Sequence, residues 1–175
     1  MKFATFEAVK IRRTGPLEQI ILFSVSHQTF AIAASVVQEI RSTDSLSGTA
    51  SEIDCPALPK VRHTIERARQ TYYVVNAAQH FGLPVSRPAL VLILRRFRVV
   101  VLVDRIDRMT EISATYPLPK AFTGEEQRWY RGLTYVDDHV IPVVQPNGFL
   151  TSQDFRRLEE AAHRETQREL EGARQ

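Results

Sequence analysis

Histidine and cysteine are the residues of this chain with the widest chemical use, because their side chains bind metals, carry protons and attack substrates. The five histidines are scattered along the sequence, and none lies three or four positions from another. Cys55 and His63 lack the two further ligands that a zinc site requires. A thiol beside a proline in a loop is more often inert than nucleophilic. We therefore expect no metal centre and no catalytic cysteine. The histidines are His27, His63, His80, His139 and His163.

Acidic residues and glycine-rich segments suggest no catalytic chemistry either. Asp104, Asp107 and Glu111 lie on or after an apolar run, where Arg105 and Arg108 are their natural partners. Acid–base catalysis needs carboxyl groups that converge on one substrate, and nothing in this spacing establishes convergence. The sequence contains no nucleophile elbow, P-loop, dinucleotide-binding glycine motif or zinc-protease motif. We expect neither an enzyme nor a cofactor.

The composition predicts the kind of fold that must position any binding residues. A chain of 175 residues that is 43% hydrophobic and 25% charged suits one globular domain, or two small subdomains that share a core. One cysteine cannot support a disulfide framework, and a net charge of +3 is weak evidence for a nucleic-acid partner. The apolar runs fall short of the roughly 20 residues that span a bilayer, and the N-terminus has no apolar signal segment. We expect a soluble cytoplasmic protein without membrane insertion.

Apolar runs separated by polar turns predict a mainly β fold. Residues 19–32 read as a hairpin around Ser-His-Gln-Thr, and residues 88–106 read as a hairpin with a basic turn. The continuous apolar runs of the second hairpin imply that both faces of its strands are buried. Residues 132–144 predict two strands around an Asp137–Asp138 turn. Residues 33–41 fit either a short helix or a strand.

Two loops and a terminal helix complete the pattern. Residues 43–59 and 115–127 are predicted to be surface loops, the first because it is rich in Ser, Thr, Gly, Asp and Pro. Residues 151–175 predict a helix, which Asp154 and a neighbouring hydroxyl residue could cap. Its apolar stripe is thin. This predicts a polar helix that lies against the strands or frays into solvent, with docking to a partner as the alternative.

Four motifs, in the expected order, resemble the CheW-like domain family. ILFSVSHQTFAIAASVVQEIR is similar to the opening of these domains, which ends in a V-x-E-I element, and FGL at Phe81–Leu83 matches the end of the first-half signature. VVVLVDRIDRMTEI resembles the second-half G-L-V-V-D stretch, with Asp104 at the aspartate. WYRGLTYVDDHVIPVV resembles the closing strand pair. The resemblance covers roughly residues 17–150.

The resemblance implies a fold and a role. The fold is two intertwined SH3-like β-barrels of five strands each, with a hydrophobic core between them. We expect an N-terminal extension at residues 1–16, the two-subdomain CheW-like domain at 17–150 and the C-terminal helix at 151–175. Family members are adaptors without enzymatic activity that couple the cytoplasmic tips of chemoreceptors to the regulatory domain of a CheA-type histidine kinase. A two-component signalling role in chemotaxis or motility follows from the resemblance.

One segment departs from the family pattern. Where family members commonly read N-L-R-G, this chain has Glu66, Arg67, Ala68 and Arg69. The family arginine is expected to pair with the glutamate of V-x-E-I, here Glu39. With alanine at that position, the pair is either lost or supplied by Arg67 or Arg69 in a shifted register. Three further family residues differ: a proline is replaced by Tyr73, an aspartate by Asn76 and a second arginine by Ala78.

These motifs define the expected partner-binding surface, and two alternatives accompany it. Glu39 is its least ambiguous member, because a charge in an apolar setting needs a partner. The apolar members are more commonly core residues than contacts. A diverged module of a pilus-type motility pathway with altered partners is the first alternative. A nucleic-acid-binding barrel is the second, suggested by the basic turn at residues 95–98, although we expect a solvated hairpin tip there and no nucleic-acid partner. The expected surface comprises Val37, Glu39, Ile40, Arg67, Arg69, Phe81, Gly82 and Asp104.

Overall fold

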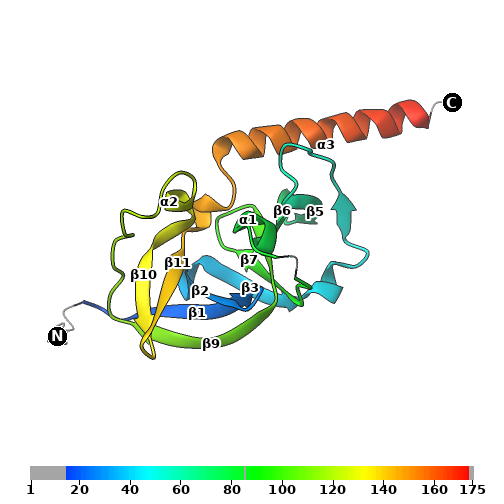
Figure 1. Cartoon of the computed structure of the whole chain (residues 1–175). Coiled ribbons are helices and arrows are strands. Elements are labelled where there is room, and N and C mark those ends of the chain that lie inside the picture. The colour runs from blue at the N-terminus through cyan, green and yellow to red at the C-terminus, as the bar shows by residue number, and fades with distance from the viewer. Residues whose placement is uncertain (1–14, 85, 174–175) are drawn as a thin grey trace, which may run out of the picture.

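The computed structural model of the chain describes residues 15–84 and 86–173, and it contains two β-sheets and a long C-terminal helix (Figure 1). The expected N-terminal extension at residues 1–16 lies almost wholly outside the described residues. Short helices connect the strands. The α-helices are α1 (Ala77–His80), α2 (Glu126–Trp129) and α3 (Ser152–Gly172), and the 3-10 helices are Ala34–Val36, Thr43–Leu46 and Pro146–Gly148.

The first sheet combines strands from both ends of the chain. Its order is β10-β11-β2-β1-β9, with β11 and β2 parallel and the other pairs antiparallel. Figure 1 shows the blue N-terminal strands beside the yellow β10 and β11. The sheet is therefore assembled from segments that precede and follow the intervening part of the sequence, which gives the intertwined arrangement that was predicted. Its strands are β1 (Glu18–Val25), β2 (Gln28–Ala33), β9 (Arg105–Ile112), β10 (Tyr130–Val136) and β11 (His139–Val144).

The second sheet is formed by the intervening part of the sequence and has six strands instead of the expected five. Its order is β3-β7-β8-β6-β5-β4, with β6 and β8 parallel. The extra strand, β4, lies in the 43–59 segment that was predicted to be a loop, and it pairs with β5 at the sheet edge. The strands are β3 (Val37–Ser42), β4 (Ala50–Glu52), β5 (Val61–Arg67), β6 (Gln70–Asn76), β7 (Leu90–Leu94) and β8 (Val99–Val103).

The predicted hairpins are confirmed. The β1–β2 turn lies at Ser26–His27, and the β10–β11 turn lies at Asp137–Asp138. The β7–β8 hairpin falls within residues 88–106. For residues 33–41 both alternatives are present, since a 3-10 turn leads directly into β3.

Buried side chains form three clusters, which explains the continuous apolar runs. Each sheet has one outer cluster on the face that points away from the other sheet. The outer cluster of the first sheet contains Ile20 and Leu22, and that of the second sheet contains Val91 and Val100. The central cluster lies between the sheets and contains Phe23, among other residues of both sheets. Successive residues of β1, β7 and β8 alternate between an outer cluster and the central one. Both faces of these strands are therefore buried, and the mainly β, two-subdomain fold is confirmed. The hydrogen-bonded ladders of the described strands nevertheless leave both sheets open, with β9 and β10 as the edges of the first and β3 and β4 as the edges of the second.

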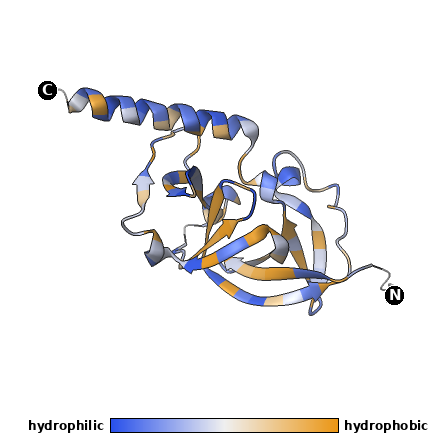
Figure 2. Ribbon diagram, turned by 180° about the vertical axis from the view of Figure 1, so that it is seen from behind, coloured by the Kyte–Doolittle hydropathy of each residue, from blue (hydrophilic) through white to orange (hydrophobic). Residues whose placement is uncertain are grey.

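Helix α3 lies across the outside of the second sheet. A capping box starts it, in which Thr151 Oγ1 accepts from Asp154 N and Asp154 Oδ2 accepts from Thr151 N. Leu158 is fully buried in the central cluster, whereas Leu170 is 60% exposed. Figure 2 shows the helix mostly hydrophilic along its length. It therefore docks through a narrow stripe, as predicted for a polar helix lying against the strands.

Candidate protein-interaction site

An ion-pair cluster around Glu39 joins two strands of the second sheet. Glu39 lies on the edge strand β3, and its Oε2 lies 2.7 Å from Nη2 of Arg67 on β5. Its Oε1 pairs with Arg41, two residues along on the same strand. The side chains of Glu39 and Arg67 are 30% and 27% exposed. These charges satisfy one another and remain accessible from solvent.

The two arginines hold Glu39 in its charged form. Hydrogen bonds from Arg41 and then Arg67 are the largest causes of a lowered Glu39 pKa, and partial desolvation opposes them. Glu39 is therefore ionised at neutral pH. The cluster presents two guanidinium groups around one carboxylate at the edge of the sheet.

The Glu39–Arg67 pair bridges strands that are not neighbours. In the sheet order, β7, β8 and β6 separate β3 from β5. Neighbouring strands lie about 4.8 Å apart, so a flat sheet would hold β3 and β5 roughly 19 Å apart. The pair can form only because the sheet curls. Glu39 lies opposite Ile93, and Arg67 follows Ile65 by two residues, which places both charges on the face that holds the outer cluster of this sheet. The ion pair thus spans the open side of the curled sheet.

The β5–β6 turn explains how Arg67 reaches Glu39. Arg67 pairs with Gln70, and Ala68 and Arg69 form a two-residue turn with φ values of 49° and 62°. Arg69 occupies the position of the family glycine and adopts the positive φ that glycine favours. Of the two candidate arginines, Arg67 makes the ion pair. Arg69 is exposed and makes none within residues 15–84 and 86–173.

The apolar residues of β3 differ in exposure because a bulge interrupts the strand. Val37 is buried in the central cluster, and the register shifts between Val37 and Glu39. Ile40, for which the core was the favoured interpretation, is instead 40% exposed. It lies opposite Leu92 on β7, but β3 is an edge strand, so no further strand covers Ile40.

Phe81 and Gly82 hold structural positions at the end of α1. Phe81 is buried, and its ring centroid lies 4.4 Å from that of Phe30, which confirms the core role. Gly82 has a φ of +65° and ends the helix, as glycine does after a helical C-terminus. Asn76, which replaces the family aspartate, caps the same helix by accepting from Gln79 N at 3.1 Å. Asparagine at this position therefore supplies the cap of α1.

Asp104 lies apart from the Glu39 cluster. It follows the last residue of β8, at the end of that strand opposite the basic turn. Its Oδ2 accepts from Ser26 N at 2.7 Å, which holds the β1–β2 turn. The structure thus brings together Glu39 and Arg67, with Ile40 next to Glu39 in the sequence of β3 and Arg69 in the turn that follows β5. Sequence reasoning missed Arg41, although its place two residues after Glu39 on a strand would have indicated a shared face.

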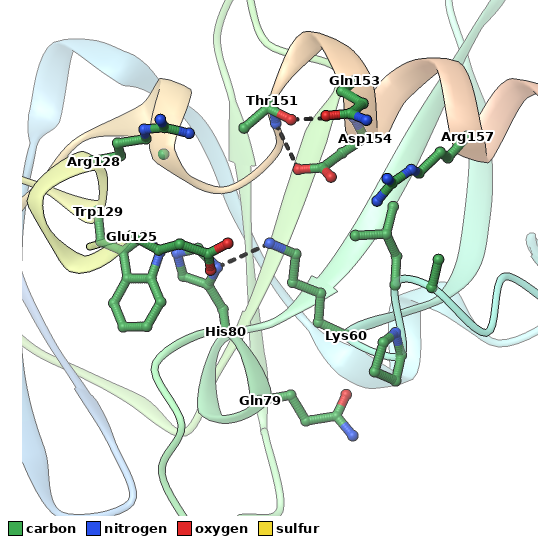
Figure 3. A pocket seen from close by; sticks show the side chains of 14 residues that line it. Lys60, Gln79, His80, Glu125, Arg128, Trp129, Thr151, Gln153, Asp154 and Arg157 are labelled. Carbon is green, nitrogen blue, oxygen red and sulfur yellow. Dashed lines mark hydrogen bonds between the residues drawn. The ribbon is translucent and has the colours of Figure 1, made fainter.

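A polar cleft of about 560 Å³ was also missed by sequence reasoning (Figure 3). It lies where the segment 57–60, α1, α2 and the start of α3 meet. Lys60 Nζ donates to the Phe149 carbonyl oxygen at 2.7 Å and lies 3.2 Å from His80 Nδ1. These contacts tie the segment before β5 to the segment before α3. No local sequence pattern links residues so far apart.

Burial lowers the pKa values of Lys60 and His80 in this cleft. Desolvation, with a smaller effect from the Lys60 charge, lowers the pKa of His80 to about 3. Desolvation also lowers the pKa of Lys60, which Asp154 and Glu125 partly offset. His80 is therefore neutral at neutral pH and can accept a hydrogen bond from Lys60.

Two observations concern other kinds of site in the described part of the chain. No three His, Cys, Asp or Glu side chains there are placed to hold a metal ion. None of the described helices is both long and apolar enough to span a bilayer.

Comparisons with known proteins concern the fold and the family of the chain. The sequence model of the CheW-like domain family matches residues 19–154. The scaffolding protein TtCheW from Thermoanaerobacter tengcongensis has a similar structure, with a TM-score of 0.61 and 17% sequence identity over 74% of this chain and 90% of that one. No curated protein proved similar enough in sequence to serve as a relative. The family match ends at the third residue of α3.

Proposed function

Because the chain belongs to the CheW-like domain family, we propose that it is a non-enzymatic signalling adaptor that couples chemoreceptors to a CheA-type histidine kinase in a chemotaxis or motility pathway. Its partners would be the cytoplasmic receptor tip and the regulatory domain of the kinase, and the adaptor would act in the cytoplasm. The observation that carries the proposal is the accessible Glu39–Arg67 pair on the curled second sheet.

The chemistry around this pair suits protein docking. The edge strand β3 has unpaired backbone groups on one side, and Ile40 adds an exposed apolar side chain on the face opposite Glu39. Accessible charges at such a strand edge give a protein interface its orientation and specificity. Val37, Phe81, Gly82 and Asp104 would support this surface through the fold instead of touching the partner.

The altered β5–β6 turn favours a second candidate. The family segment N-L-R-G is replaced throughout, and the ion-pairing arginine comes from a different position. A partner that reads this turn would meet different side chains here. A diverged module of a pilus-type pathway with altered partners is therefore the alternative.

Binding measurements with the kinase regulatory domain and receptor tip from the same genome test the proposal. Glu39→Ala should weaken binding by about thirtyfold while the protein remains folded, because it removes a charge from the proposed interface and leaves Arg41 and Arg67 without their carboxylate, a loss on the order of 2 kcal/mol. Glu18→Ala is the matched control, since Glu18 forms a similarly exposed ion pair with Arg131 on the first sheet. Absence of binding by the wild-type protein to every such partner at tens of micromolar would contradict the proposal.

A charge swap separates a docking role of the pair from a purely structural one. Glu39→Arg combined with Arg41→Glu and Arg67→Glu keeps both ion pairs of the cluster but reverses the groups presented to a partner. We expect the swap to preserve the melting temperature and leave binding weak. If the swap restores wild-type binding, the pair acts only through the fold.

A further inference from the structure

Two basic turns lie at one end of the second sheet. Strands β6 and β8 are parallel, with Tyr73 beside Val99, so the turns that precede these strands face the same way. The turn before β8 contains residues 95–98, and the turn before β6 contains Arg69. Arg98 of the turn before β8 contacts β6, because its guanidinium lies 5.9 Å from the Tyr73 ring centroid.

Three arginines of these turns have no carboxylate partner in the described part of the chain. Arg69, Arg95 and Arg96 are exposed, whereas Arg67 and Arg98 pair with Glu39 and Glu159. In the strand order β7-β8-β6-β5, both turns lie at the same end of these four strands, one at the β7–β8 hairpin and one at the β5–β6 hairpin. We call Arg69, Arg95 and Arg96 the arginine end. Their guanidinium groups concentrate positive charge on a chain with a net charge of only +3.

The surroundings of the arginine end select the kind of ligand. Guanidinium groups bind carboxylates in paired, planar geometry. Glu39 and the exposed Glu66 flank the turns, and these carboxylates would repel a long polyanion that continues past them. Phe97 packs against the central cluster, so its ring is not free to stack on a base. A short acidic segment fits this surface better than a nucleic acid does.

We propose that the arginine end is a docking surface for a short acidic segment of a partner protein. The surface adjoins the Glu39 cluster, since Arg67 ends the strand that leads into the Arg69 turn. The inference rests on the proposed function only in taking the partner to be a protein. A synthetic peptide therefore tests it without the receptor or the kinase, and its failure would leave the adaptor proposal untouched.

The experiment is a nuclear magnetic resonance titration of the full chain with a short peptide of alternating glutamate and serine. We expect shifts at the amides of Arg69, Arg95 and Arg96, and binding that weakens as salt rises. The combined substitution of the arginine end by glutamate should weaken binding by roughly tenfold or more, because it replaces three attractive contacts with repulsive ones. The matched control reverses the exposed Arg87, Arg128 and Arg164, which lie outside the two basic turns, and should change binding less than about threefold.

Other outcomes overturn the inference. If a glutamine–serine peptide gives the same shifts, binding does not depend on the negative charge of the peptide. Equal weakening by both triple variants would show a diffuse effect of net charge. Tighter binding of a DNA duplex, or of phosphatidylserine vesicles, at these same amides would assign the surface to nucleic acid or to membrane. Melting temperatures of both triple variants, measured beside the wild type, establish that each is folded.

Discussion

His80 is a titratable side chain that the fold keeps neutral. It is 4% exposed, lies among Phe81, Trp129 and Phe149, and faces the ammonium group of Lys60. A protonated imidazole would place two positive charges side by side in a poorly solvated cleft. The pKa of His80 in the folded protein therefore lies far below the ordinary value of 6.5.

This resistance makes stability depend on pH. The folded pKa of about 3 lies below the unfolded value of 6.5, so between these limits only the unfolded state binds the proton. The stabilising contribution of His80 is present above pH 6.5 and is lost as the pH falls toward 3. Denaturant unfolding should show the wild type losing about 1.4 kcal/mol per pH unit more than His80→Gln between roughly pH 6 and 4. His163→Gln, at an exposed site on α3, is the control and should retain the wild-type slope. Equal slopes for the wild type and His80→Gln would contradict the burial argument.

At the scale of single elements, the β5–β6 turn has a backbone geometry that suits a hairpin, but its two residues do not favour that geometry. Two-residue turns with positive φ match the twist of antiparallel strands, and Asn-Gly is their preferred sequence. This chain places Ala68 and Arg69 there. The register is nevertheless kept, because the alternation of β5 and β6 buries Ile65 and Val74 on one face. The strands, and not the turn residues, determine this hairpin.

Relieving the turn should stabilise the protein. Ala68→Asn with Arg69→Gly is expected to raise the free energy of unfolding by about 1 kcal/mol, because side chains with a Cβ other than Asn and Asp are disfavoured at positive φ. Asp138→Gly provides the comparison, since Asp138 has a φ of 63° in the equivalent turn of the first sheet. Its gain should be smaller, because aspartate tolerates this conformation. A double variant less stable than the wild type in urea unfolding would refute the argument. The same variant also lacks one arginine of the arginine end, so it should bind the acidic peptide more weakly.

The sequence predicted the elements whose signals are local. Hairpins around Ser26–His27 and Asp137–Asp138 have apolar strands and polar turns within a few residues. Strand β4 has three residues, of which Ser51 and Glu52 are exposed, so it has almost no apolar pattern and forms through pairing with β5. The prediction that Ile40 is a core residue was wrong for a related reason. Its exposure follows from the position of β3 at the edge of the sheet, which the sequence of β3 alone does not reveal. Such properties depend on the sheet order and not on the strand itself.

At the scale of the whole molecule, the candidate site depends on how the second sheet curls. The sequence indicated Glu39 and two candidate arginines, but the choice of Arg67 follows from the closure that brings β5 to β3. The Lys60–His80 cleft likewise needs the segment before β5, α1, α2 and the start of α3 to meet. Family motifs could identify the fold and Glu39, whereas contacts between distant elements required the structure.

Helix α3 tests whether the molecule unfolds as one unit. Leu158 is fully buried in the central cluster, to which both sheets contribute, and α3 is further held by Arg98–Glu159 at 2.7 Å and by Glu165 accepting from Asp54 N at 2.8 Å. Leu158→Ala should therefore lower the free energy of unfolding by about 2–4 kcal/mol. Leu170→Ala, the same substitution at a 60% exposed position of the same helix, should change it by less than about 0.5 kcal/mol.

The two optical signals of the protein decide between an integral and a detachable helix. Far-ultraviolet ellipticity follows α3, and the fluorescence of Trp129, the single tryptophan, follows the packing beside the central cluster. If α3 is integral to the core, Leu158→Ala shifts both urea transitions together, because removing the buried side chain weakens the contact that the sheets share with the helix. If ellipticity is lost early while the Trp129 transition stays at its wild-type midpoint, α3 is a separately docking segment. Its apolar face would then be free to bind a partner, as the sequence alternative allowed.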